Sequence, residues 1–98
     1  MIQEILGQGK DNARTAKELA DALKCNVRDI TAAVEQERRD GAAICASCGN
    51  PPGYYLAADP DELDTYCRRL KSRAIEIFKT RQALVKVLQQ IQEQKKTE

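Results

Sequence analysis

The feature that most constrains this chain is a stretch from residue 61 to about residue 94 that holds neither glycine nor proline. Asp59 precedes it as a helix N-cap, and Pro60 suits the first helical position, where its missing amide costs nothing. Apolar residues recur through the stretch at alternating intervals of three and four, the period of a helix with one apolar stripe. The sequence therefore predicts a single long helix over residues 59–96.

This stripe has the spacing of heptads with a uniformly apolar d column and a mixed a column, in which Arg81 is the charged residue nearest the middle. A lone helix would leave such a stripe in water, so it suits a coiled coil or another partner helix. We expect a homodimer, and the alternative is that the helix folds back on the rest of the chain. The predicted dimerisation residues are Leu63, Leu70, Ile77, Leu84, Leu88 and Ile91.

The composition narrows the class of protein. With 98 residues the chain fits a small fold, predicted as a domain over residues 1–58 followed by the long helix. Charged residues make up 32% and nearly cancel at net +1, which argues against a purely electrostatic nucleic-acid binder. The absence of histidine removes Ser-His and Cys-His catalytic pairs, so we expect no enzyme. No apolar run could span a bilayer and no signal-peptide core is present, so a cytoplasmic location is expected.

Two shorter helices are predicted before residue 41. Thr15 and Glu18 form a capping box at the start of the first, and Asn26 is a good N-cap for the second, over residues 26–40. A break of about three residues separates them, and Gly41 ends the second. The pattern is typical of a helix-turn-helix. Its inward stripes are predicted to be Ala16, Leu19, Ala20, Leu23, Val27, Ile30 and Val34.

A β-hairpin over residues 42–57 is predicted directly after the second of these helices. Ala42–Ala46 is short and apolar, Gly49–Gly53 is rich in turn residues, and Tyr54–Ala57 is strand-prone. Side chains alternate along a strand, so one of Tyr54 and Tyr55 is expected in the core and the other exposed. At the other end of the chain, the spacing of apolar residues over 2–6 predicts a short N-terminal helix.

Residues 15–56 resemble winged helix-turn-helix DNA-binding domains, and among these the N-terminal domains of biotin-repressor-like proteins. The likeness rests on the runs Thr15–Leu23, Asn26–Ile30, Glu37–Gly41 and Gly53–Leu56. The chain is also similar to small winged-helix proteins of phages and prophages of Gram-positive bacteria, which have a Cys-rich wing and a helical tail.

The resemblance implies a mainly α fold with a β-hairpin wing, and a phage-type transcriptional regulator bound to double-stranded DNA. Helix 26–40 would read the major groove and the 42–57 hairpin would act as the wing. Winged domains also serve as protein-interaction modules. A winged-helix adaptor that binds a protein partner and no DNA is therefore the alternative, favoured by a wing tip without Lys or Arg.

The side of helix 26–40 opposite its core stripe carries residue types that can read bases. Arginine can form a bidentate pair with guanine, glutamine can do so with adenine, and alanine can pack against a thymine methyl group. Lys17, near a helix N-terminus, is placed to contact a phosphate. An ordinary solvated helix face is the alternative. The predicted DNA-binding residues are Lys17, Asn26, Arg28, Thr31, Ala32, Glu35, Gln36 and Arg39, with Ser47, Asn50 and Tyr54 in the wing.

The four cysteines include one CxxC motif, Cys45 to Cys48, which lies on the predicted hairpin. With Cys25 and Cys67 the chain offers four thiolates, the number that a structural zinc site uses. A second CxxC motif and histidine are both missing. We therefore expect structural thiols, no metal and no cofactor, with zinc binding or a redox role as alternatives.

Overall fold

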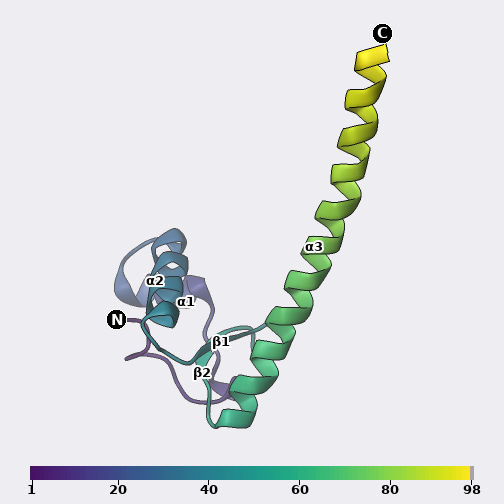
Figure 1. The fold of residues 1–98 in the computed structure, drawn as a ribbon. Helices are drawn as coiled ribbons and strands as arrows, with labels where there is room; N and C mark the ends of the chain where they lie inside the picture. The colour runs from purple at the N-terminus through teal and green to yellow at the C-terminus, as the bar shows by residue number, and fades with distance from the viewer. Residues whose placement is uncertain (98) are drawn as a thin grey trace. The chain divides into compact units, whose positions relative to one another are not determined.

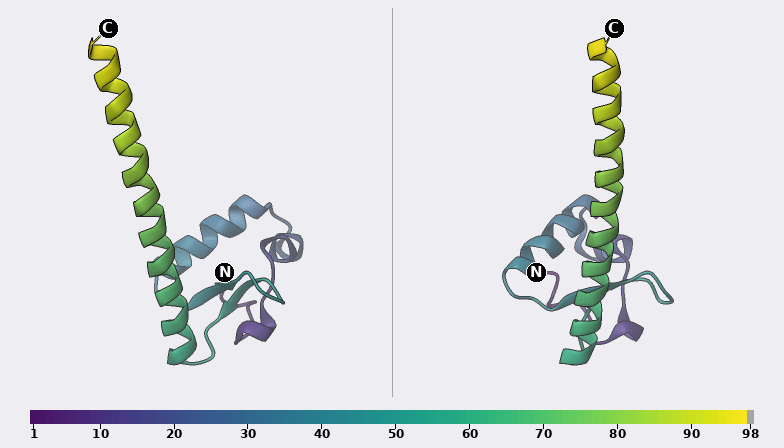
Figure 2. Two further views of the ribbon diagram at one scale, coloured as in Figure 1. Left: turned by 90° about the vertical axis from the view of Figure 1, so that its right-hand side faces the viewer. Right: turned by 45° about the vertical axis from the view of Figure 1, so that its right-hand side comes forward.

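A computed structural model describes residues 1–97 (Figures 1 and 2). It has a 3₁₀ helix η1 (Lys10–Asn12), helices α1 (Ala16–Leu23) and α2 (Val27–Arg39), strands β1 (Ile44–Ser47) and β2 (Gly53–Leu56), and helix α3 (Pro60–Thr97). The predicted α+β fold with a long C-terminal helix is confirmed. The chain forms two compact units, Met1–Tyr66 and Cys67–Glu98.

Both short helices begin where their capping residues predict. The Thr15 hydroxyl accepts a hydrogen bond from the Glu18 amide at 3.1 Å, and the Glu18 carboxylate accepts one from the Thr15 amide at 3.4 Å. Asn26 accepts from the Asp29 amide at 2.9 Å in the same way at the start of α2. Lys24 adopts a left-handed conformation, with φ of 56°, which ends α1 three residues before α2 begins.

The predicted hairpin is confirmed, and the N-terminal segment extends it on one side. In the antiparallel pair β1–β2, Ile44 lies opposite Leu56 and Ser47 opposite Gly53. The amide of Arg14 donates to the carbonyl of Tyr54 at 2.9 Å, and the Tyr54 amide donates back at 2.7 Å. Gly53 has φ of +116°, and a Cβ there would collide with the Arg14 carbonyl group. A glycine is therefore required where the N-terminal segment crosses β2.

The predicted N-terminal helix is wrong. Residues 3–5 form a single turn, closed by a hydrogen bond from the Ile5 amide to the Ile2 carbonyl at 3.0 Å. The segment before Gly7 is too short for its helical hydrogen bonds to offset the free-energy cost of helix nucleation. Ile2 and Leu6 are nevertheless buried, so the apolar spacing identified core residues while misassigning the backbone.

The first unit buries apolar side chains on both faces of its hairpin. One cluster joins Ile2, Leu6, Leu19, Ala20, Ile30, Val34 and Ile44, and the second joins Cys45, Tyr55 and Tyr66. Burial is confirmed for Leu19, Ile30, Val34 and Ile44, while Leu23 and Leu56 are partly buried against the first cluster.

Two predictions about the core are wrong. Val27 is 47% exposed, because it is the first residue of α2 and its side chain leans past the end of the helix. Neither tyrosine of the hairpin is exposed: Tyr55 is buried in the second cluster and Tyr54 is half-buried against the first. Packing on both faces of the hairpin removes the exposed face that strand alternation alone predicts.

Helix α3 begins as predicted, with the Asp59 carboxylate accepting from the Glu62 amide at 2.8 Å. Its first turns belong to the first unit, which runs to Tyr66 rather than to residue 58. Leu63, the first of the predicted dimerisation residues, is partly buried against the second cluster, so part of its surface is already covered within this unit. Among the described residues, no helix is both long and apolar enough to cross a membrane.

Candidate nucleic-acid interface

The outer face of α2, defined as Arg28, Ala32, Glu35, Gln36 and Arg39, is exposed along its whole length. Ile30 and Val34 on the opposite side are 0% and 1% exposed. The helix is therefore held rigidly by one side while it presents the other to solvent. This is the arrangement that the periodicity of residues 26–40 predicts, and it places the five predicted side chains together.

Most polar groups on or beside the outer face already have partners on the same helix. Glu35 lies 3.4 Å from a nitrogen of Arg38 and 3.9 Å from one of Arg39. Gln36 donates to Asp40 at 3.2 Å, and the hydroxyl of Thr31 donates to the Val27 carbonyl at 3.2 Å. These exposed contacts are weak and can be exchanged for a ligand at little cost.

Arg28 differs from its neighbours on the outer face. Within residues 1–97 it forms no hydrogen bond or ion pair, and it lies in the first turn of α2. Asn26, just before it, uses its side-chain oxygen to cap the helix. At this end of α2, Arg28 can therefore contact a ligand without giving up an existing interaction, whereas Asn26 has a structural role to maintain.

The predicted wing residues do not all point outward. Ser47 is 7% exposed and its hydroxyl accepts from the Gly49 amide at 3.0 Å, while Tyr54 is half-buried. Asn50 is exposed in the turn between the strands. A Cβ built on Gly49 would lie 3.5 Å from the Nζ atom of Lys10, so an ammonium group borders the hairpin turn. Sequence reasoning missed Lys10 here because it reaches the turn through the tertiary fold.

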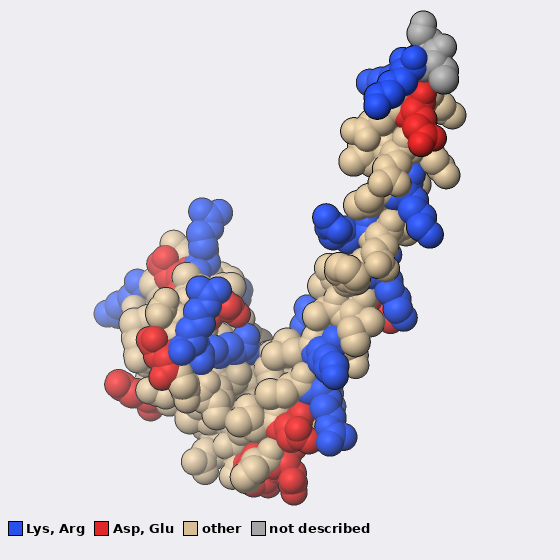
Figure 3. Space-filling view, in the orientation of Figure 1, with Lys and Arg blue, Asp and Glu red and all other residues tan. Residues whose placement is uncertain are grey.

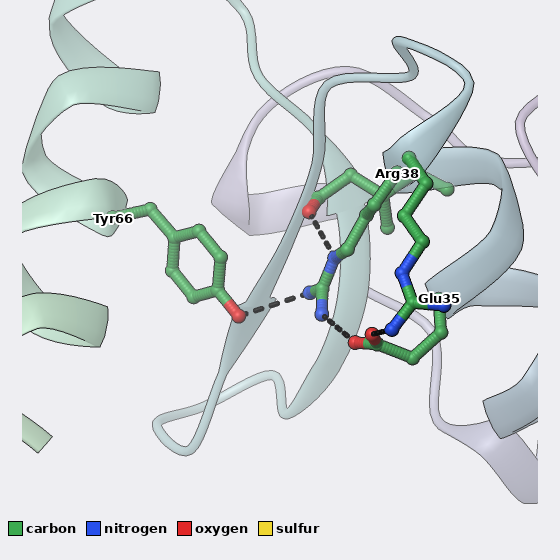
Figure 4. Close-up of polar contacts among 5 residues, drawn as sticks. Glu35, Arg38 and Tyr66 are labelled. Atoms are coloured by element: carbon green, nitrogen blue, oxygen red, sulfur yellow. Dashed lines mark hydrogen bonds and ion pairs between the residues drawn. The ribbon is translucent and has the colours of Figure 1, made fainter. Parts of the chain in front are cut away.

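Arg38 joins three elements of the first unit (Figure 4). Its Nε donates to the Ile44 carbonyl at 2.9 Å, and a terminal nitrogen donates to the Tyr66 hydroxyl at 2.9 Å. The guanidinium carbon also lies 5.4 Å from the centre of the Tyr66 ring and 5.9 Å from that of Tyr54. Arg38 thereby fixes α2 against the hairpin and the start of α3, and its charge is not available on the outer face.

Glu37 anchors the N-terminal segment to the last turn of α2. Its carboxylate accepts from the amides of Ile2 at 2.8 Å and Gln3 at 2.9 Å, and from the amino group of Met1 at 3.3 Å. Burial alone raises the pKa of Glu37, but the bonds from Gln3 and Ile2 and the nearby amino group outweigh it and lower the pKa below 4.5. Helical periodicity could have placed Glu37 on the inward side of α2, because it lies three positions after Val34.

Lys17 is exposed in the first turn of α1, as its predicted role requires. The cysteines are scattered by comparison: Cys45 is buried, Cys48 and Cys67 are exposed, and Cys25 is half-buried. Within the part of the chain that the structure describes, no group of three or more His, Cys, Asp or Glu residues is placed to hold a metal ion.

Comparison of the chain with models of protein families, with curated proteins and with solved structures finds no match. The candidate interface is therefore characterised by its own geometry. It consists of the outer face of α2, with Arg28 at its capped end, together with Lys17 on α1 and Lys10 beside the hairpin turn.

Proposed function

We propose that the first unit is a winged helix-turn-helix domain that binds double-stranded DNA, as a transcriptional regulator of phage type. The observation that carries this proposal is the outer face of α2, a continuous exposed surface on a helix whose other side is fixed by Ile30 and Val34. In this class of domain the second helix enters the major groove and its N-terminal residues reach base edges.

The distribution of cations supports the same orientation. Arg28 lies in the first turn of α2, where it can form a bidentate pair with guanine. Lys17 and Lys10 are suited to phosphate contacts, one at the start of α1 and one beside the hairpin turn. With a net charge of +1 the chain binds random DNA weakly, so recognition depends on base contacts.

The test is a selection from a random DNA library at low salt, followed by affinity measurements on the enriched sequence. Arg28→Ala is expected to cost about 1–3 kcal/mol, or roughly 5- to 150-fold in affinity, and to relax base choice at one position. Lys17→Ala is expected to weaken all sequences alike and to lower the salt slope by about one. Arg69→Ala, which removes the same charge from the second unit, is the control and leaves base choice unchanged.

A protein-interaction adaptor is the second candidate. It is favoured by the hairpin turn itself, which has no Lys or Arg between residues 47 and 54, and by Glu35 in the middle of the outer face. An acidic group there repels DNA phosphates but suits a basic protein surface. A selection that enriches no motif at low salt would overturn the DNA proposal and favour the adaptor.

A further inference from the structure

The second unit exposes many large apolar side chains, and its uncharged surface is visible between the Lys and Arg side chains in Figure 3. Large apolar side chains of this unit retain between 39% and 66% of their exposure: Leu70, Ile75, Ile77, Phe78, Leu84, Val87, Leu88 and Ile91. Six of them, Leu70, Ile77, Leu84, Val87, Leu88 and Ile91, lie on one side of the helix and together expose roughly 550 Å² per chain, at the upper end of the largest apolar patches on monomeric proteins. Two copies that pair through this side would bury about 1,000 Å² of apolar surface, which is near the lower limit for a specific interface.

We propose that this surface pairs with a second copy of the chain in antiparallel orientation, with Ile77 level with Leu88 of the second copy. A shallow groove on α3, lined by Ile77, Thr80, Arg81, Leu84, Val85 and Leu88, marks the middle of the exposed apolar side and sets this register. Its lining is symmetric about the point between residues 82 and 83. A two-fold axis through that point, as a closed pair of identical chains requires, places Ile77 opposite Leu88 and Arg81 opposite Leu84 of the second copy.

In this register two kinds of layer pair apolar side chains, and the stems of Arg81 and Lys95 lie beside Leu84 and Leu70 in the other two. Ile77 packs against Leu88, Arg81 lies beside Leu84, and Ala74 faces Ile91, so that a small side chain meets a large one. The flanking positions match as well. Phe78 meets Val85 of the second copy, whereas a parallel pair in the same heptads would place Phe78 against Arg73 and desolvate a charge.

Arg81 provides the electrostatic argument. A parallel pair places both copies of Arg81 in one layer, with the two guanidinium groups side by side. Side chains of a helix lean toward its N-terminus, so in an antiparallel pair the two groups diverge. Each arginine stem can then cover Leu84 of the other copy while its charged end reaches water.

The orientation is tested by oxidation of engineered cysteine pairs in the full chain. In a background with Cys48→Ser and Cys67→Ser, the combined variant Leu70→Cys with Lys95→Cys brings two thiols into one layer of the antiparallel pair. We expect oxidised glutathione to convert it into a covalent dimer, seen on a non-reducing gel. Leu70→Cys alone and Lys95→Cys alone are the matched controls, and each should remain a single chain.

A natural cysteine gives a second readout that needs no change to the seam. With only Cys48→Ser present, antiparallel pairing holds the two copies of Cys67 about 45 Å apart, so oxidation should form no bond between them. Cross-linking of Cys67 to Cys67, or of Leu70→Cys alone, would show a parallel pair and overturn the proposal. Absence of cross-linking in the combined variant would overturn it too. The inference does not depend on DNA binding.

Discussion

The two units differ in how far they bury the same residue type. Ile30 in the first unit is 0% exposed, whereas Ile77 in the second is 66% exposed. Ile30 is covered by residues from several elements of its own unit, while the described part of the second unit consists of one stretch of α3 and contains no second element. Both lie in apolar stripes of helical period. Periodicity therefore shows which side of a helix is to be buried, but it does not show what covers it.

Substituting each isoleucine by alanine tests whether its apolar contacts form within one chain or between two chains. Ile30→Ala should lower the free energy of unfolding by about 2–5 kcal/mol at any protein concentration, because it leaves a cavity in the core of one chain. Ile77→Ala should have a smaller effect that grows with concentration, because its contacts form between chains. Denaturant unfolding at two concentrations measures both. Equal, concentration-independent losses would mean that Ile77 packs within its own chain.

Much of the first unit could be predicted because its signals are local. Thr15 and Asn26 cap helices through residues three positions away, and Ile30 and Val34 are one turn apart on α2. The errors come from contacts between distant segments. Glu37 binds amides 34 and 35 positions earlier in the chain, and Tyr54 is covered on the face that its own strand would leave exposed.

Arg38 and Arg39 are neighbours in the sequence, but Arg38 is partly buried in contacts with other elements whereas Arg39 is exposed on the outer face of α2. Arg38→Met keeps the apolar stem but removes the hydrogen bonds to Ile44 and Tyr66, and should cost about 1.5–3 kcal/mol of stability. Arg39→Met, which loses one exposed ion pair at 3.9 Å, should cost about 0–0.5 kcal/mol. Thermal or urea unfolding compares them, and similar losses would show that the Arg38 bonds contribute nothing beyond a surface charge.

The outer face of α2 and its core side could both be predicted, because the same helical period determines which residues lie on each side. The predicted Arg28 and Gln36 are exposed, and Arg38, which the sequence analysis did not place, lies on the inward side. Lys10 could not be placed beside the hairpin turn, because that position depends on how residues 8–14 run along β2. Local periodicity thus predicts a face, while the surroundings of that face require the tertiary fold.

The contribution of Glu37 to the stability of the first unit should depend on pH. Its lowered folded pKa means that its stabilising contribution is complete above 4.5 and is lost as pH falls through the folded value. Glu37→Gln should therefore cost about 1–2 kcal/mol near neutral pH, and the difference from wild type should shrink below 4.5. Urea unfolding across this range measures it, with the exposed Glu4→Gln as control. A difference that is constant with pH would contradict the assignment.

The claim that the exposed stripe of the second unit is an interface is tested most directly by sedimentation equilibrium of the full chain. Wild type should shift from the mass of one chain toward two as concentration rises. Leu84→Asp, which places a charge in the central groove, should stay monomeric, whereas Gln90→Asp on the opposite side of α3 should associate like wild type. A concentration-independent mass of one chain for wild type would contradict the account, since the exposed apolar residues would then have no second copy to cover them.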